Sequence, residues 1–157
     1  AQESRGLGDV YKRQMCMQFS PRLAMSDRTE RDVAAVRAYL EASMRPDPVA
    51  AAACVAPQFL CRFTGNREFT APDGPTRVNT ARYAWVKKRI DRYDAMPDGA
   101  RTVVYCTGHL YGAWPDGTPF DHNRFVDRFV VEDGLIWETD VWNDSAEWLL
   151  DPALSRR

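Results

Sequence analysis

The chain has 157 residues, a length that fits one domain with a single sizeable core. Its 21 Lys and Arg and 22 Asp and Glu give a net charge of −1, which argues against a nucleic-acid partner, because proteins that bind phosphate backbones carry a clear basic excess. No run approaches the roughly 18 apolar residues of a membrane helix, so the sequence predicts no membrane span.

The four cysteines, Cys16, Cys54, Cys61 and Cys106, form no CxxC pair and no Cys/His cluster with the spacing of metal ligands. We therefore expect no metal site. Reduced structural thiols are typical of a cytoplasmic protein, which is the location the sequence predicts.

Residues 1–24 look foreign to the rest of the chain. The stretch "AQESRGLGDVYKRQ" has neither helical nor strand periodicity and lacks the charged start and apolar centre of a signal peptide. It resembles translated adapter sequence of the kind found in metagenomic gene models, whereas "MSDRTERD" at Met25 resembles a natural start. We expect residues 1–24 to be a non-native or disordered leader and residues 25–157 to form one domain.

Helices dominate the first half of this domain. A helix is predicted over residues 27–44, with Ser26 as its N-cap and an apolar stripe at Val33, Val36, Tyr39 and Leu40. A second, Ala-rich helix is predicted over residues 48–55. The segment "QFLCRFTG" follows as a short strand, residues 65–75 as a loop, and a third helix begins at Pro75 and extends through Trp85 and Val86.

Strands dominate from residue 90 onward. Turn sequences at residues 97–99, 115–117 and 133–134 separate "RTVVYCTGHLYG", "NRFVDRFVV" and "LIWETDVW", and "SAEWLL" follows as a short helix or an edge strand. This order predicts an α+β domain, in which N-terminal helices pack on a strongly curved, cone-shaped antiparallel sheet. The space between helices and sheet is a common place for a small-molecule site.

Alternation along the strands predicts which side chains face this space. On the first of the three strands we assign Tyr105, Thr107, His109 and Tyr111 to the pocket. On the second, the arginines Arg124 and Arg128 mark the other face as solvent-exposed. The pocket face of the second and third strands then holds Asn123, Phe125, Asp127, Phe129, Trp137, Thr139, Val141 and Asn143.

The motifs "VVYCTGH", "WPDG" and "NRFVDRFVVEDGLI" resemble the nuclear transport factor 2-like superfamily, over residues 85–143. That superfamily includes SnoaL-type polyketide cyclases, ketosteroid isomerase, limonene-epoxide hydrolase and scytalone dehydratase, and the motifs are most similar to the phenazine-biosynthesis A/B proteins. The resemblance implies the conical α+β fold and a small-molecule substrate. It does not imply one reaction, since this fold hosts many.

The resemblance also suggests site residues. His109 falls where limonene-epoxide hydrolase-like proteins have a pocket carboxylate, and Asp127 where ketosteroid isomerase-like proteins have the acid of their oxyanion hole. Tyr39, followed by "LEAS", resembles their helix tyrosine. Val141 occupies a position that often carries a carboxylate, and Cys61 lies near the position of the ketosteroid isomerase base, so none of those specific reactions can be transferred.

These residues predict a cofactor-independent enzyme that performs isomerase-, cyclase- or dehydratase-type acid–base chemistry on an apolar, oxygenated molecule. In this hypothesis His109 takes or shuttles the proton. Asp127 either orients His109, because a carboxylate beside an imidazole raises its basicity, or, if protonated, donates a hydrogen bond to an oxyanion. Tyr39 and Asn123 would hydrogen-bond the substrate. The remaining wall residues would be Tyr105, Thr107, Tyr111, Phe125, Phe129, Trp137, Val141 and Asn143.

Two alternatives stay open. An epoxide hydrolase of the limonene-epoxide hydrolase type needs a second pocket carboxylate, which Asp140 would supply if a bulge turned it inward. A non-catalytic ligand-binding homodimer is the other, and Trp142 and Trp148 suggest the dimer contact. Arg89, Arg92 and the pair Lys87 and Lys88 are expected to form a solvated charged edge, and His122 to be an exposed turn residue.

Overall fold

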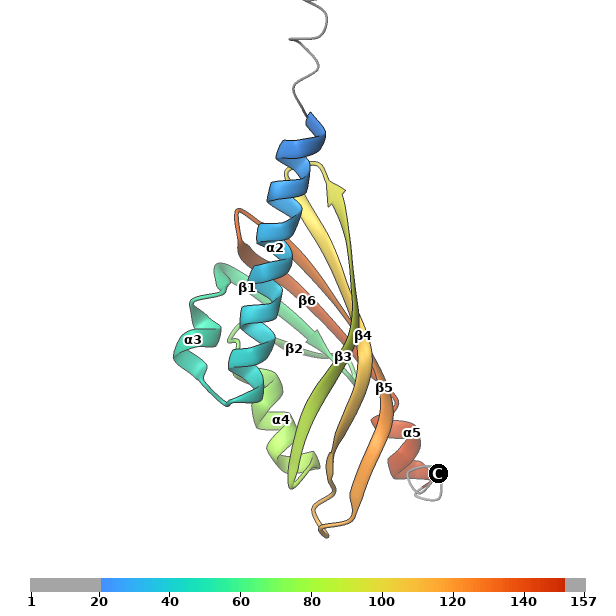
Figure 1. The fold of residues 1–157 in the computed structure, drawn as a ribbon. Helices are drawn as coiled ribbons and strands as arrows, with labels where there is room; N and C mark the ends of the chain where they lie inside the picture. The colour runs from blue at the N-terminus through green and yellow to red at the C-terminus, as the bar shows by residue number, and fades with distance from the viewer. Residues whose placement is uncertain (1–20, 152–157) are drawn as a thin grey trace, which may run out of the picture.

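A computed structural model describes residues 21–151, with side chains from Asp27 onward (Figure 1). The predicted leader lies outside the described residues except for residues 21–24, which form the start of the first helix. In chain order the elements are α2 (Pro21–Met44), α3 (Pro48–Ala52), β1 (Val55–Phe63), β2 (Arg67–Phe69), α4 (Gly74–Arg82), β3 (Trp85–Asp98), β4 (Arg101–Ala113), β5 (Pro119–Glu132), β6 (Leu135–Asn143) and α5 (Ser145–Leu150).

The six strands form one curved sheet in the order β2-β1-β6-β5-β4-β3, and α2, α3 and α4 lie against one of its faces (Figure 1). The predicted α+β architecture is confirmed. The sheet is mixed rather than wholly antiparallel, because β1 pairs in parallel with β6 while the other neighbours are antiparallel.

Several predicted boundaries are wrong. Helix α2 begins at Pro21, so Ser26 lies inside the helix and does not cap it. Strand β3 begins at Trp85, which the helical spacing had placed in the third helix, and residues 67–69 form the short strand β2 inside the predicted loop. Sheet pairing outweighs local periodicity here, since Trp85 pairs with Ala113 and Cys61 pairs with Phe69.

The pairing of β4 with β5 contains a bulge that decides which side chains share a face. Near the turn, Gly112 lies opposite Phe120, whereas beyond the irregularity Leu110 lies opposite Asn123. Two residues of β5, Asp121 and His122, thus oppose the single residue Tyr111, and His122 has a φ of 63°, in the left-handed region. One extra residue moves every later side chain of β5 to the opposite face relative to β4.

Glycine shapes the same region on the β3 side of β4. A Cβ atom at Gly108 would lie 2.1 Å from the backbone oxygen of Arg89, so the β3 backbone approaches β4 more closely than any side chain would allow. The β3–β4 register shifts between Ile90 and Arg92, beside this approach. The glycine and the bulge bend the sheet around helix α2.

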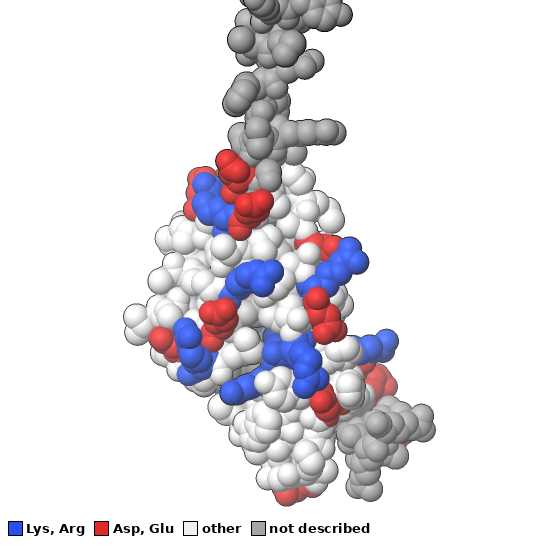
Figure 2. All heavy atoms as spheres, in the orientation of Figure 1, with Lys and Arg blue, Asp and Glu red and all other residues white. Residues whose placement is uncertain are grey.

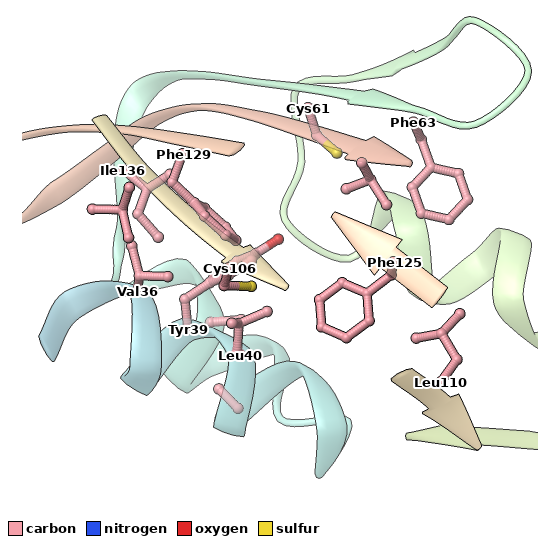
Figure 3. Packing of buried hydrophobic residues seen from close by; sticks show 14 of the residues in the cluster. Val36, Tyr39, Leu40, Cys61, Phe63, Cys106, Leu110, Phe125, Phe129 and Ile136 are labelled. Carbon is pink, nitrogen blue, oxygen red and sulfur yellow. The ribbon is translucent and has the colours of Figure 1, made fainter. Parts of the chain in front are cut away.

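The core lies between α2 and the concave face of the sheet. Val36, Tyr39 and Leu40 of α2 point toward Phe129 of β5, and Phe125 lies farther along β5 (Figure 3). Tyr39 meets the Phe129 ring edge-on, with centroids 6.1 Å apart. The predicted apolar stripe of this helix therefore supplies one wall of the core.

Asp32 is a buried polar anchor between this helix and the sheet. Its side chain is fully buried, and its two oxygens accept hydrogen bonds from Thr102 Oγ1 at 2.6 Å and from the backbone N–H of Gly134 at 3.1 Å. The carboxylate thus joins α2 to β4 and to the β5–β6 turn.

We predict that Asp32→Ala lowers the free energy of unfolding by about 3 kcal/mol, because one buried and one half-buried donor lose a charged acceptor. Urea denaturation of the purified variant measures this loss. Glu41→Ala, at an exposed position of the same helix, is the matched control and should change stability by less than about 0.5 kcal/mol. Equal stability of the two variants would contradict the anchoring role.

Candidate functional site

A cavity of about 100 Å³ lies between α2, α4 and the concave face of the sheet. Its lining is mostly apolar, with a few polar groups that converge on it, which is the usual composition of a small-molecule site. The residues that line it from α2 and the strands include Tyr39, Leu40, Cys61, Phe63, Lys88, Leu110, Phe125, Asp127, Phe129, Thr139, Val141 and Asn143.

Asp127 is the one carboxylate among the described residues that line this cavity. It is 1% exposed, and it lies opposite Cys106 of β4 on one side and Val141 of β6 on the other. Its Oδ2 accepts a hydrogen bond from Lys88 Nζ, whereas its Oδ1 is buried and has no protein partner. Asp127 therefore has one neutralised oxygen and one available oxygen.

Lys88 reaches Asp127 from β3, across the intervening strand β4. Lys88 lies opposite Leu110, and Asp127 lies opposite Cys106, so the residue between them on the concave face of β4 is Gly108. Gly108 therefore presents no side chain between the two residues. The ammonium also lies 4.3 Å from the centre of the Phe125 ring, within cation–π distance.

Burial determines the protonation of the groups around this pair. It raises the pKa of the Asp127 carboxyl above its ordinary value, and the adjacent Lys88 ammonium opposes that rise. Burial, together with the charge of Asp127, raises the pKa values of the Cys61 and Cys106 thiols to about 12. It also raises the pKa of the Tyr39 hydroxyl, so the thiols and the hydroxyl are neutral near pH 7.

Four predicted pocket residues on β4 lie on the wrong face. Cys106 shares the concave face with Asp127, so the alternate residues Tyr105, Thr107, His109 and Tyr111 point to the convex face. His109 lies opposite Arg124, its Nδ1 is 3.1 Å from Asp91 Oδ2, and its ring lies edge-on to that of His122. The expected contact between His109 and Asp127 does not exist, because the bulge at His122 shifts the register by one residue.

The other predicted site residues divide into three groups. Phe125, Phe129, Val141, Asn143 and Tyr39 line the cavity, and the Tyr39 hydroxyl donates to the Pro72 carbonyl at 3.4 Å. Asn123 is buried outside the cavity lining and donates to Ser145 Oγ at 3.0 Å. Trp137 was also placed wrongly: the register shifts next to it, and Ile136 fills the core while the Arg101 guanidinium lies over the Trp137 ring.

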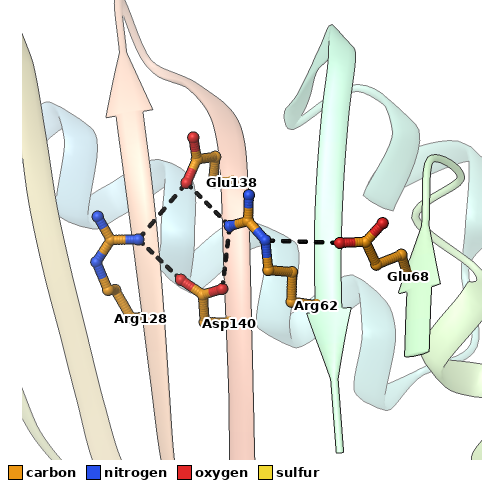
Figure 4. Close-up of polar contacts among 5 residues, drawn as sticks. All are labelled: Arg62, Glu68, Arg128, Glu138 and Asp140. Carbon is orange, nitrogen blue, oxygen red and sulfur yellow. Dashed lines mark hydrogen bonds and ion pairs between the residues drawn. The ribbon is translucent and has the colours of Figure 1, made fainter. Parts of the chain in front are cut away.

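Asp140 lies on the convex face and does not turn into the cavity. Its oxygens are 3.3 Å from Arg62 Nη1 and 2.8 Å from Arg128 Nη1, and Glu138 and Glu68 extend the same charged network (Figure 4). No β6 bulge re-aims Asp140 itself, because Thr139 faces the core opposite Phe129 and Cys61.

Lys88 is the cavity residue that the sequence analysis missed. The lysine pair was expected to be a solvated edge because the segment was interpreted as the end of a helix. If this segment is a strand, the side chains of Val86, Lys88 and Ile90 point to the same face. The two apolar residues of this set indicate that this face packs against the core. A charge between two core residues requires a partner, which Asp127 supplies.

The remaining surface shows no single field of charge on the side seen in Figure 2, where acidic and basic side chains are interspersed. Trp142 is exposed on the convex face, whereas Trp148 packs against Phe120. The homodimer stays a prediction.

Within residues 21–151 no helix is long and apolar enough to cross a membrane. The residues described contain no cluster of three metal-ligating side chains.

We predict that Lys88→Met destabilises the protein more at about pH 8 than at about pH 5. Without the ammonium, only burial acts on Asp127, so the pKa of its carboxyl rises further above the unfolded value. The folded state then binds a proton that the unfolded chain releases, and the free energy of unfolding falls as pH rises above the usual aspartate range of about 4.

Urea denaturation at the two pH values measures this difference, which should reach at least about 1 kcal/mol, because one pKa unit corresponds to about 1.4 kcal/mol. The double variant Lys88→Met/Asp127→Asn is the control and should lose the added pH dependence. A single variant that is equally destabilised at both pH values would show that Lys88 does not offset the buried carboxylate.

Comparisons with known proteins agree with this architecture. No protein-family model and no curated protein sequence matches the chain. Among solved structures, an NTF2-like protein of unknown function from Burkholderia pseudomallei is similar, with a TM-score of 0.63 and 20% identity, over 76% of this chain and 95% of that one.

Two further solved structures with a similar fold are described as a cyclase and as an epoxide hydrolase. A candidate SnoaL-like polyketide cyclase from Jannaschia has a TM-score of 0.59 and 17% identity, over 81% of this chain and 92% of that one. An LEH-like epoxide hydrolase from Mycobacterium tuberculosis has a TM-score of 0.58 and 18% identity, over 82% and 93%. The chain therefore has the nuclear transport factor 2-like fold that SnoaL-like proteins share, as its strand motifs predict.

Proposed function

We propose that this chain is a cofactor-independent enzyme that removes and returns a proton next to a carbonyl group of an apolar small molecule. The observation that carries this proposal is the state of Asp127: a carboxylate buried in an apolar cavity, with Oδ2 on Lys88 and Oδ1 without a partner. A carboxylate desolvated in this way is a stronger base than one in water.

In the proposed reaction, Asp127 Oδ1 takes the proton from the carbon beside the carbonyl. The electron pair of the broken C–H bond moves onto the carbonyl oxygen, where the Lys88 ammonium stabilises the developing charge. The neutral Tyr39 hydroxyl is a second donor inside the cavity if it releases Pro72. Return of the proton to another carbon completes an isomerisation, and loss of a leaving group instead completes an elimination.

Asp127 and Tyr39 thus remain catalytic residues, as the sequence suggests, and Lys88 takes the place of His109 as the partner of Asp127. The walls formed by Phe125, Phe129 and Val141 favour an apolar substrate body. Asn143 and the Thr139 hydroxyl, which is buried without a protein partner, are available for a second polar group of the substrate.

The epoxide-hydrolase alternative receives less support from the cavity itself. It needs a second carboxylate to activate water, and the candidate for that role, Asp140, pairs with Arg62 and Arg128 on the convex face. The similarity to an epoxide hydrolase at 18% identity concerns the fold. The non-catalytic alternative predicts ligand binding without any proton exchange.

We predict that the protein accelerates exchange of the α-protons of α-tetralone and related apolar ketones for deuterium, measured by NMR in heavy water. Asp127→Asn, which keeps the size of the side chain, should lower this rate by at least about 100-fold, the usual contribution of a general base. His109→Ala should retain the wild-type rate, because its ring lies on the opposite face.

Three results would count against the proposal. Absence of exchange above the buffer rate with every ketone would favour a binding protein. An unchanged rate in Asp127→Asn would remove Asp127 from the reaction. A selective loss in His109→Ala would return the proton transfer to the residue that the sequence pattern indicated.

A further inference from the structure

Lysine is rare in this chain, and one of its lysines contacts the carboxylate of the cavity. Three of the 21 Lys and Arg residues are lysines: Lys12, Lys87 and Lys88. Arginine supplies the other 18 basic side chains, so the amine at position 88 differs from the general pattern. The Lys88 side chain is 19% exposed, whereas Lys87, which also borders the cavity, is exposed. Unlike a guanidinium, an amine can lose its proton and act as a nucleophile.

The fold holds the Lys88 amine in one place. Its nitrogen contacts Asp127 Oδ2 and lies 4.3 Å from the centre of the Phe125 ring. Val86 and Leu110 add apolar surroundings at the same end of the cavity. These surroundings keep bulk water from the amine and restrict its rotation, which lowers the entropic cost of bringing it to a bound carbonyl.

The contact with Asp127 also gives the ammonium a place to send its proton. Transfer of one proton from Lys88 to Asp127 converts the ion pair into a neutral amine and a neutral acid, and an apolar site lowers the free-energy cost of forming this neutral pair. The raised pKa of the Asp127 carboxyl has the direction that assists this transfer. The Cys61 and Cys106 thiols are neutral neighbours and do not compete for the proton.

We propose that Lys88 forms a covalent imine with an aldehyde or ketone bound in the cavity and that Asp127 moves the protons of this step. The inference rests on the proposed function and specifies its substrate class as carbonyl compounds that can condense with an amine. It gives Lys88 a second role besides that of a charged donor.

The ammonium gives one proton to Asp127, and the amine adds to the carbonyl carbon to form a carbinolamine after its second proton moves from nitrogen to oxygen. Asp127 returns the first proton to the hydroxyl, which leaves as water, and a protonated imine with one N–H remains. Asp127 is again a carboxylate, paired with the positive imine, and its Oδ1 can take the α-proton. The electron pair then forms an enamine instead of an enolate.

The test uses the full chain and benzoylacetone, an apolar diketone that condenses with amines to a stable conjugated enaminone with loss of one water. We expect one adduct whose mass increase equals that of the diketone less water, and peptide mapping should locate it at Lys88. Its formation should be at least about tenfold faster at Lys88 than at Lys87, since a lysine shielded in an apolar site is the activated one. No adduct, or equal labelling of Lys87 or Lys12, would overturn the proposal.

Two variants separate this inference from the proposed function. Lys87→Arg is the matched control and should keep the adduct. Lys88→Arg keeps a cation beside Asp127 but cannot form an imine, so it should lose both the adduct and most of the α-tetralone exchange. If Lys88→Arg instead exchanges α-protons at the wild-type rate, the imine is not a step of the reaction, while the proton transfer by Asp127 stands. Because the labelling of the wild-type chain is itself decisive, the test does not depend on the folding of either variant.

Discussion

The β-bulge opposite Tyr111 decides which side chains of β5 share a face with those of β4. It places two residues of β5 against one of β4, and this extra residue puts Asp127 on the same face as Cys106 rather than Tyr105. The cavity therefore receives a carboxylate among apolar side chains. The tyrosines and His109 of β4 point to the convex face, where their polar atoms reach water and charged neighbours such as Asp91.

A buried carboxylate requires a compensating partner. Strand β3, which is two strands away from β5 in the sheet, supplies a positively charged one. Lys88 of β3 contacts Asp127 of β5 across the intervening strand β4, where the residue between them on that face is Gly108. A Cβ atom at this glycine would meet the β3 backbone, so the glycine permits the close approach of β3 to β4. The pairing of the sheet therefore brings the two charged groups together. Their proposed proton transfer follows from the desolvation of both groups in one cavity.

The sequence predicts the α+β class, the three long C-terminal strands and the inward face of β5, since two arginines mark the other face of that strand. It also predicts that Phe125, Asp127, Phe129 and Val141 share one surface. The β4–β5 register depends on a bulge whose signal is a single residue with positive φ, His122, and alternation cannot locate it. Lys88 was missed for a related reason: the helical spacing before residue 90 gave no strand face on which to place it. The uniformly apolar series Val104, Cys106 and Leu110 was the better indication of the inward face of β4.

In the proposed reaction, Lys88 and Asp127 act as one unit inside the cavity. A double-mutant cycle in α-tetralone exchange measures this coupling, with Lys88→Met, Asp127→Asn and the double variant. Because each residue needs the other, the double variant should exchange about as slowly as the slower single variant. If the two losses multiply in the double variant, the residues contribute independently, and the account of a coupled pair is wrong.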